Sequence, residues 1–159
     1  MEKELQKQNA MSVLDLNELK KIYLSAKVES ELLEAGDVLP TNTLITYLKK
    51  DEKDRLISMS HTFIPLPQEV FPDIKLLQFY TELPFKGGEE IIQFLLDTNR
   101  QLPFGNFGRS ESGEIYFRYV HVLPKYDTLN THSDTLLNLI NGILFILKIN
   151  TSLIEEKCF

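Results

Sequence analysis

Cysteine is almost absent from this 159-residue chain, which contains only Cys158. A disulfide framework within the chain is therefore excluded. A long uninterrupted apolar run is missing as well. The longest apolar stretch, residues 136–149, is broken by two asparagines, a glycine and a lysine. Because a helix needs about 20 predominantly apolar residues to cross a bilayer, this stretch predicts no membrane span.

A surplus of basic charge is also missing. The chain has 17 Lys and Arg against 23 Asp and Glu, for a formal net charge of −6. Nucleic-acid binding needs a basic face that displaces counterions, and anionic membrane surfaces attract basic segments. Neither partner is expected. The first residues, MEKELQKQNAM, are charged and lack the apolar core of a signal peptide, so we expect a cytoplasmic protein.

The length suits one domain with a full hydrophobic core. Residues 1–12 are interpreted as a flexible tail and residues 13–159 as a single domain. Asp15, followed by Glu18 three residues later, is typical of a helix start. A helix is predicted over residues 15–27, because apolar residues there recur at helical spacing. Those residues are Leu16, Leu19, Ile22, Tyr23 and Ala26.

Three strands are predicted next, over residues 43–49, 55–64 and 74–83. In the second, apolar and polar residues alternate, which is typical of a half-buried strand. One face then carries Ile57, Met59, His61 and Phe63. Residues 28–39 are compatible with either a continued helix or a strand.

The second half of the chain predicts a helix over residues 89–99, two strands over 104–108 and 115–123, and a final helix. The helix over residues 89–99 is expected to be deeply packed, because its apolar residues cover more than half its circumference. The pair Thr131 and Asp134 indicates a capping box for the final helix, which is expected to end near Lys148. The order α-β-β-β-α-β-β-α predicts an α+β fold: an antiparallel sheet of about five strands with helices mainly on one face.

Residues 102–122, LPFGNFGRSESGEIYFRYVHV, combine a Pro-Gly turn, a short aromatic segment, a Gly-centred turn and an aromatic-rich strand. With the element order, this block resembles the YbjN family, whose fold is similar to that of the small acidic chaperones of type III secretion. The resemblance covers most of residues 40–148 and is sharpest over 99–122, whereas residues 28–39 fit poorly. It implies a chaperone-like module that dimerises and holds partner segments, linked to signalling or stress regulation. It brings no catalytic residues.

Residues that could carry chemistry do not form pairs. His61, His121 and His132 each lack a second ligand at a spacing usual for metal sites. Cys158 lacks an evident base. Ser110 lies in a GRSES segment that lacks the final glycine of a nucleophile elbow and is predicted to form a hairpin. We therefore expect no enzyme activity, no metal and no cofactor.

Four residues are candidates for partner binding. Phe145 and Ile149 fall on the side of the last helix opposite its apolar core side, where an exposed patch often marks an interface. Alternatively, residues 28–39 or the C-terminal tail cover this side. Tyr116 and Arg118 lie on an aromatic-rich strand. Arg118 stacks on Tyr116 or Tyr80, pairs with a partner's carboxylate, or is simply exposed to solvent.

The expected function is a non-catalytic, chaperone-like module that captures a segment of a partner protein, working as a homodimer. The alternative is a regulatory or assembly factor that binds one folded partner protein.

Overall fold

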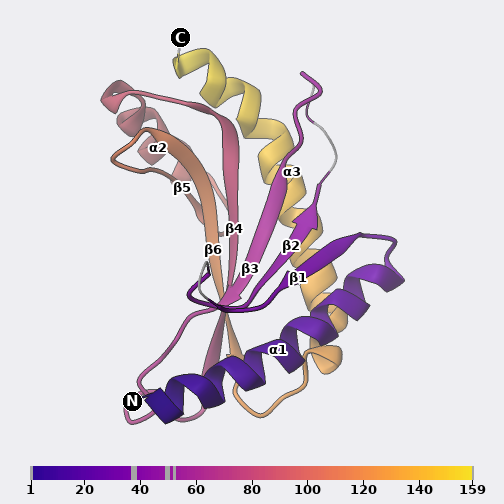
Figure 1. Cartoon of the computed structure of the whole chain (residues 1–159). Helices are drawn as coiled ribbons and strands as arrows, with labels where there is room; N and C mark the ends of the chain where they lie inside the picture. Colours follow the sequence, from indigo (N-terminus) through magenta and orange to yellow (C-terminus); the bar gives the residue numbers. More distant parts are fainter. Residues whose placement is uncertain (1, 37–38, 49–50, 52, 159) are drawn as a thin grey trace.

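The computed structural model (Figure 1) describes residues 2–36, 39–48, 51 and 53–158. Its centre is a six-stranded antiparallel sheet in the order β1-β2-β3-β4-β6-β5. The class is therefore α+β, as the sequence predicts. The strands are β1 (Ser30–Leu33), β2 (Thr43–Tyr47), β3 (Ser58–Phe63), β4 (Ile74–Lys86), β5 (Asn106–Arg109) and β6 (Glu114–Pro124). The helices are α1 (Glu2–Ser25), α2 (Ile92–Asn99) and α3 (Ser133–Cys158), with 3₁₀ turns η1 (Glu89–Ile91) and η2 (Leu129–His132).

The sixth strand comes from the segment whose state the sequence leaves open. Residues 30–33 form the edge strand β1, in which Ser30 lies opposite Thr46 and Leu33 opposite Thr43. The expected element order is corrected accordingly, with four strands rather than three before α2. Four residues are too short to show periodicity. Residues 37–38 of this segment lie outside the described part.

All six strands bury the same face of the sheet. Leu44, His61, Phe79 and Tyr119 follow one another across β2, β3, β4 and β6 in register. This face packs against buried residues of α1, α2 and α3 in one hydrophobic cluster, and Figure 1 shows α1 crossing the lower end of the sheet while α3 runs behind β2 and β3. The predicted inward face of residues 57–63 is confirmed, and Ile115, Phe117 and Tyr119 of β6 pack on the same side.

Helix α1 begins at Glu2 and not at Asp15. Residues 2–12, expected to form a flexible tail, make up its first turns. Contacts distant in sequence hold them: Gln8 donates a hydrogen bond to the Leu66 carbonyl at 3.1 Å, and Asn42 donates one to the Asn9 carbonyl at 2.8 Å. The helix ends where Lys27 takes a positive φ of 61°, a common left-handed helix stop.

Helix α3 is longer than predicted and starts differently. It runs ten residues beyond Lys148, to Cys158. Thr131 is not its cap, because it lies in η2 and its hydroxyl donates to the Thr128 carbonyl at 2.7 Å. The expected deep packing of α2 is also wrong. Ile92 and Leu96 are 43% and 49% exposed, since only one side of this short helix meets the core.

Strand β4 runs through Pro84 rather than stopping there. Its pairing with β6 shifts register between Glu82 and Lys86, and a proline that cannot donate to the ladder is tolerated at such an irregularity. The hairpin between β5 and β6 turns at Gly113, whose φ is 93°. This confirms the predicted turn position.

An ion-pair cluster holds the added C-terminal part of α3 against the β2–β3 connection. Both terminal nitrogens of Arg55 donate to the Glu155 carboxylate, at 2.9 and 2.8 Å, and its Nε donates to Asp51 at 2.8 Å. Lys53 reaches the same Glu155 at 2.9 Å. The hydrogen bonds from Arg55 lower the pKa of Glu155 to about 2. A charge-assisted, bidentate pair of this kind fixes orientation as well as position.

The only fully buried histidine of the described residues lies at the centre of the core. His61 Nε2 is 2.9 Å from the Thr46 hydroxyl, and its Nδ1 is 3.5 Å from the Tyr23 hydroxyl. Its ring also meets the edge of Phe79. Burial lowers the pKa of His61 from 6.5 to about 3, so the ring is neutral near pH 7.

Replacing Phe117 with alanine tests which face is buried. Phe117 is fully buried and meets Phe107 with ring centroids 5.3 Å apart. Phe117→Ala should lower the free energy of unfolding by about 3–5 kcal/mol in urea denaturation. Val122, on the same strand, is 57% exposed, so Val122→Ala should cost less than about 1 kcal/mol. Equal losses would contradict the assignment of faces.

His61 should make stability fall in mild acid. The unfolded chain gains a proton on His61 near pH 6.5, whereas the folded chain does not until about pH 3. Below pH 6.5 the free energy of unfolding therefore drops, by up to about 1.4 kcal/mol per pH unit. Urea melts at about pH 7.5 and about pH 5.5 measure the loss.

His61→Gln should lose less over that interval, because the glutamine does not titrate. Partial burial also lowers the pKa of His121, but both proteins share that contribution, so their difference isolates His61. An equal loss in the two proteins would show that His61 is not buried in its neutral form.

Candidate protein-binding surfaces

The sheet face opposite the core is not covered by any element that the structure describes. We call it the open face. Its side chains alternate with the buried ones along every central strand and are half-buried or exposed. It comprises Ile45, Tyr47, Ser58, Ser60, Thr62, Leu76, Gln78, Tyr80, Glu82, Tyr116, Arg118, Val120 and Val122.

Two tyrosines form the centre of the open face. The rings of Tyr80 on β4 and Tyr116 on β6 are stacked, with centroids 5.3 Å apart and planes 25° from parallel. The Tyr116 ring lies over Gly108 of β5, where a Cβ atom would come within 2.4 Å of its hydroxyl oxygen. Gly108 therefore leaves room for the ring. Partial burial and the nearby Glu82 raise the pKa of Tyr80.

Arg118 lies beside this pair, opposite Tyr80 in register. Its Nε donates a hydrogen bond to the Gln78 side-chain carbonyl at 2.6 Å. The sequence leaves three alternatives open for Arg118, and the structure does not show the first of them, stacking on Tyr116 or Tyr80. Gln78 fixes the guanidinium instead. Sequence reasoning did not find Gln78, because its nearness depends on the pairing of β4 with β6.

The second surface is an apolar stripe on α3, formed by Phe145, Ile149 and Leu153. These side chains are 63%, 49% and 48% exposed, and their four-residue spacing places them along one side of the helix. The predicted outward direction of Phe145 and Ile149 is confirmed. Leu153 was missed because the helix was expected to end near Lys148. The alternative cover, residues 28–39, forms the edge strand β1 in its described part.

The structure does not bring the four predicted residues together. Tyr116 and Arg118 are on the open face, whereas α3 packs on the buried face with its stripe turned outward.

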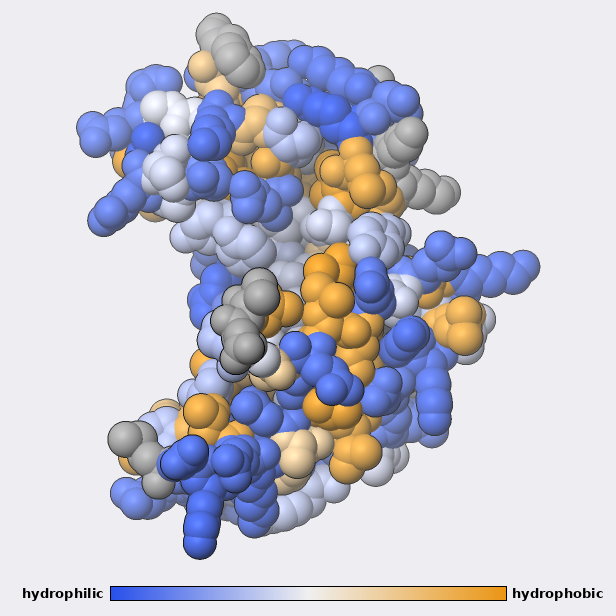
Figure 2. Space-filling view, viewed as in Figure 1, coloured by the Kyte–Doolittle hydropathy of each residue, from blue (hydrophilic) through white to orange (hydrophobic). Residues whose placement is uncertain are grey.

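Figure 2 shows apolar side chains gathered in a band down the middle of the side in view, with hydrophilic side chains around it. The exposed apolar side chains thus form a contiguous patch and are not only scattered singly, and such patches are typical of interaction sites.

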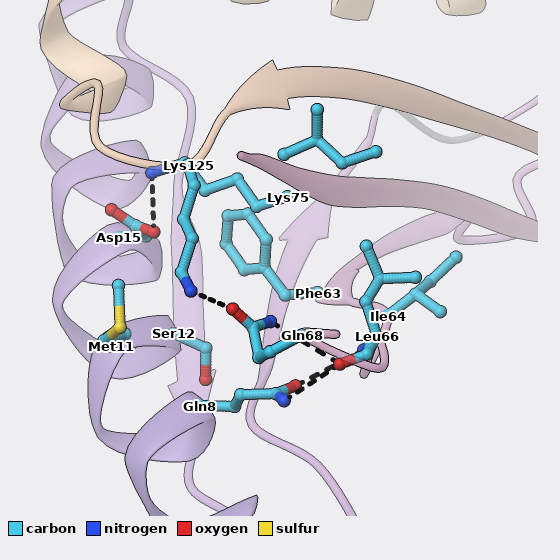
Figure 3. A pocket seen from close by; sticks show the side chains of 11 residues that line it. Gln8, Met11, Ser12, Asp15, Phe63, Ile64, Leu66, Gln68, Lys75 and Lys125 are labelled. Atoms are coloured by element: carbon cyan, nitrogen blue, oxygen red, sulfur yellow. Dashed lines mark hydrogen bonds and ion pairs between the residues drawn. The ribbon is translucent and has the colours of Figure 1, made fainter. Parts of the chain in front are cut away.

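A small cavity between α1 and the ends of β3 and β4 has a volume of about 60 Å³, room for a few water molecules. Figure 3 shows its polar side chains bound to one another. Lys75 pairs with Asp15 at 3.0 Å, and Lys125 binds Gln68. The cavity is therefore a packing gap between helix and sheet.

Ser110 and Ser112 of the GRSES segment lie in the tight turn between β5 and β6. The hydroxyls of Ser110 and Ser112 both donate to the Glu114 carboxylate, which also lies 3.5 Å from Lys86. The two serines lower the pKa of Glu114 to about 2, so this carboxylate is an ionised acceptor and a poor base at neutral pH.

The remaining candidates for chemistry have partners of their own. His121 meets the Tyr119 hydroxyl at 3.1 Å, and His132 meets Asp127 at 2.9 Å. Cys158 lies half-buried in the last turn of α3 beside Gly87, and burial, followed by Glu90 and Glu155, raises the pKa of its thiol. Over the described ranges, no three or more His, Cys, Asp or Glu side chains gather as a metal site would require.

No family model matches the chain, and no curated protein matches its sequence. One helical segment of the described chain, Leu129–Cys158, is long and apolar enough to cross a membrane by length and composition. The stretch at 136–149, judged too short for a span, is thus part of a longer helix. Of its apolar window, 33% is buried inside the molecule, and these buried residues belong to the hydrophobic core.

The arrangement predicts that Ser110 and Cys158 perform no catalysis. In a broad hydrolase screen, Ser110→Ala and Cys158→Ala should leave any background rate unchanged. The Glu114 carboxylate that accepts from Ser110 is a poor base, and burial raises the pKa of the Cys158 thiol. Protein purified without an affinity tag should contain no stoichiometric zinc in elemental analysis. Turnover abolished by either substitution, or one zinc per chain, would contradict this prediction.

Proposed function

We propose that this chain is a non-catalytic, chaperone-like module that captures a segment of a partner protein and works as a homodimer. The observation that carries the proposal is the apolar stripe of Phe145, Ile149 and Leu153. Leaving one such side chain in water forgoes about 2 kcal/mol of burial. Three in a row at helical spacing form the kind of surface on which an amphipathic segment docks.

The resemblance of residues 99–122 to the YbjN family supports the same proposal. It links the chain to chaperone-like binding modules that dimerise and act in signalling or stress regulation. The net charge of −6 is consistent with a protein partner in the cytoplasm and with neither nucleic acid nor a membrane surface as partner.

A second candidate is a regulatory or assembly factor that binds one folded partner. The composition of the open face favours it. Tyrosine and arginine are enriched at the centres of protein interfaces, and the open face has two central tyrosines and one arginine among its side chains. A broad sheet surface suits a folded partner better than a single extended segment.

Light scattering with an aggregating client tests the first candidate. A client that precipitates when its disulfides are reduced is suitable, since reductant leaves this disulfide-free chain intact. The wild type should suppress the scattering. Phe145→Asp should remain folded, because Phe145 is 63% exposed. It should nevertheless lose most of the suppression, because it places a charge in the apolar stripe.

Thr135→Asp is the matched control, because it places the same charge on an exposed position of α3 ten residues before Phe145, away from the stripe. It should suppress scattering as the wild type does. Equal suppression by Phe145→Asp and the wild type would remove the stripe from the function, and no suppression by the wild type would favour the second candidate.

A further inference from the structure

Four side chains at the centre of the open face form a block with two distinct diagonals. Tyr80 lies opposite Arg118, and Glu82 lies opposite Tyr116. The tyrosines occupy one diagonal and stack on each other. Arg118 and Glu82 occupy the other diagonal, so each strand contributes one aromatic and one charged group.

Arg118 has no acid partner among the residues the structure describes. Its Nε is bound to Gln78, which lies on the far side of Arg118 from Glu82 along the strands. The neutral amide therefore holds the guanidinium away from the one carboxylate that shares its block. Four of the five N–H donors of the group remain for an external acceptor.

Glu82 is exposed and likewise makes no ion pair or hydrogen bond within the described ranges. The next acid along β6, Glu114, is close enough to act on Tyr80 together with Glu82, so the surroundings of Glu82 are acidic as well as aromatic. Lys86, the nearest cation along β4, is paired with Glu114 at 3.5 Å. The open face thus presents one positive and one negative group that have no oppositely charged partner among the described residues.

We propose that the open face binds the open face of a second copy of this chain, with Arg118 of each copy paired with Glu82 of the other. A two-fold axis along the tyrosine diagonal exchanges the positions of the two charges, so both pairs form at once. Such a contact is isologous, the form that closed dimers take. The tyrosines of the two copies pack together at its centre, where aromatic side chains contribute most.

Charge complementarity favours a second copy over a partner surface of a single sign. A purely acidic or purely basic partner surface would satisfy one member of the Arg118–Glu82 diagonal and repel the other. A second copy satisfies both without any further group. The inference rests on the proposed homodimer, and it adds the surface and the residues that join the two copies.

Charge reversal with complementation in trans tests this interface. Sedimentation velocity at about 1–100 µM should show that the wild type dimerises, whereas R118E and E82R each associate at least about tenfold more weakly. An equimolar mixture of the two single variants should form a heterodimer. R118E carries an acid at both positions and E82R carries an arginine at both, so each of the two contacts in the mixed dimer pairs an acid with an arginine. The double variant R118E/E82R should recover the homodimer.

Net charge gives an independent control. E82R changes the formal net charge from −6 to −4 and R118E changes it from −6 to −8. If general repulsion governed association, E82R would strengthen it; the proposal expects E82R to weaken it. Glu69→Arg, at an exposed position outside the sheet, makes the same charge change and should leave the dimer intact.

A wild type that stays monomeric up to about 100 µM, or single variants that dimerise normally, would overturn the proposal. So would a mixture of variants that fails to associate. Should a charge reversal unfold the chain, Arg118→Gln and Glu82→Gln replace it, and each should weaken the dimer. The two proposals fail separately. Phe145→Asp leaves the open face unchanged, so it should lose client suppression and still dimerise. A wild type that suppresses but stays monomeric would overturn the dimer alone, and one that dimerises without suppressing would overturn client capture alone.

Discussion

The structure depends on one constraint, the burial of a single face of a six-stranded antiparallel sheet. Side chains alternate between faces along each strand, so register alone gathers the apolar residues of all strands on one side. Leu44, His61 and Phe79 show the result, because they meet in adjacent strands under the helices. His61 is tolerated there since Thr46 and Tyr23 lie at its two ring nitrogens and its ring is neutral.

The same constraint leaves two surfaces free. With every described helix on one side of the sheet, the opposite side keeps its tyrosines, its hydroxyl side chains and Arg118 in contact with solvent. A helix that packs against only one core uses about half its circumference for that contact. Helix α3 therefore turns Phe145, Ile149 and Leu153 outward. The Arg55–Glu155 pair holds the end of α3 in this orientation. Both exposed surfaces thus follow from the way the core is closed.

Much of the sheet could be predicted because strand alternation is a local signal. The inward faces of β3 and β6, the turn at Gly113 and the outward direction of Phe145 all follow from periodicity and turn chemistry. The start of α1 could not be predicted, since Gln8 and Asn42 stabilise it through contacts with residues far away in the sequence. Likewise, the sequence places Tyr116 and Arg118 on one face, but only cross-strand register shows that Gln78 binds Arg118 and that Glu82 completes the block.

The most direct test is residue-level tyrosine footprinting by mass spectrometry as a function of protein concentration. Self-association through the open face predicts that Tyr80 and Tyr116 are modified in dilute protein and become protected together as the concentration rises, while Tyr126, which is 79% exposed, is modified equally throughout. Unchanged modification of Tyr80 and Tyr116 at all concentrations would contradict self-association through the open face. Complete protection of both in monomeric protein would contradict the open face itself.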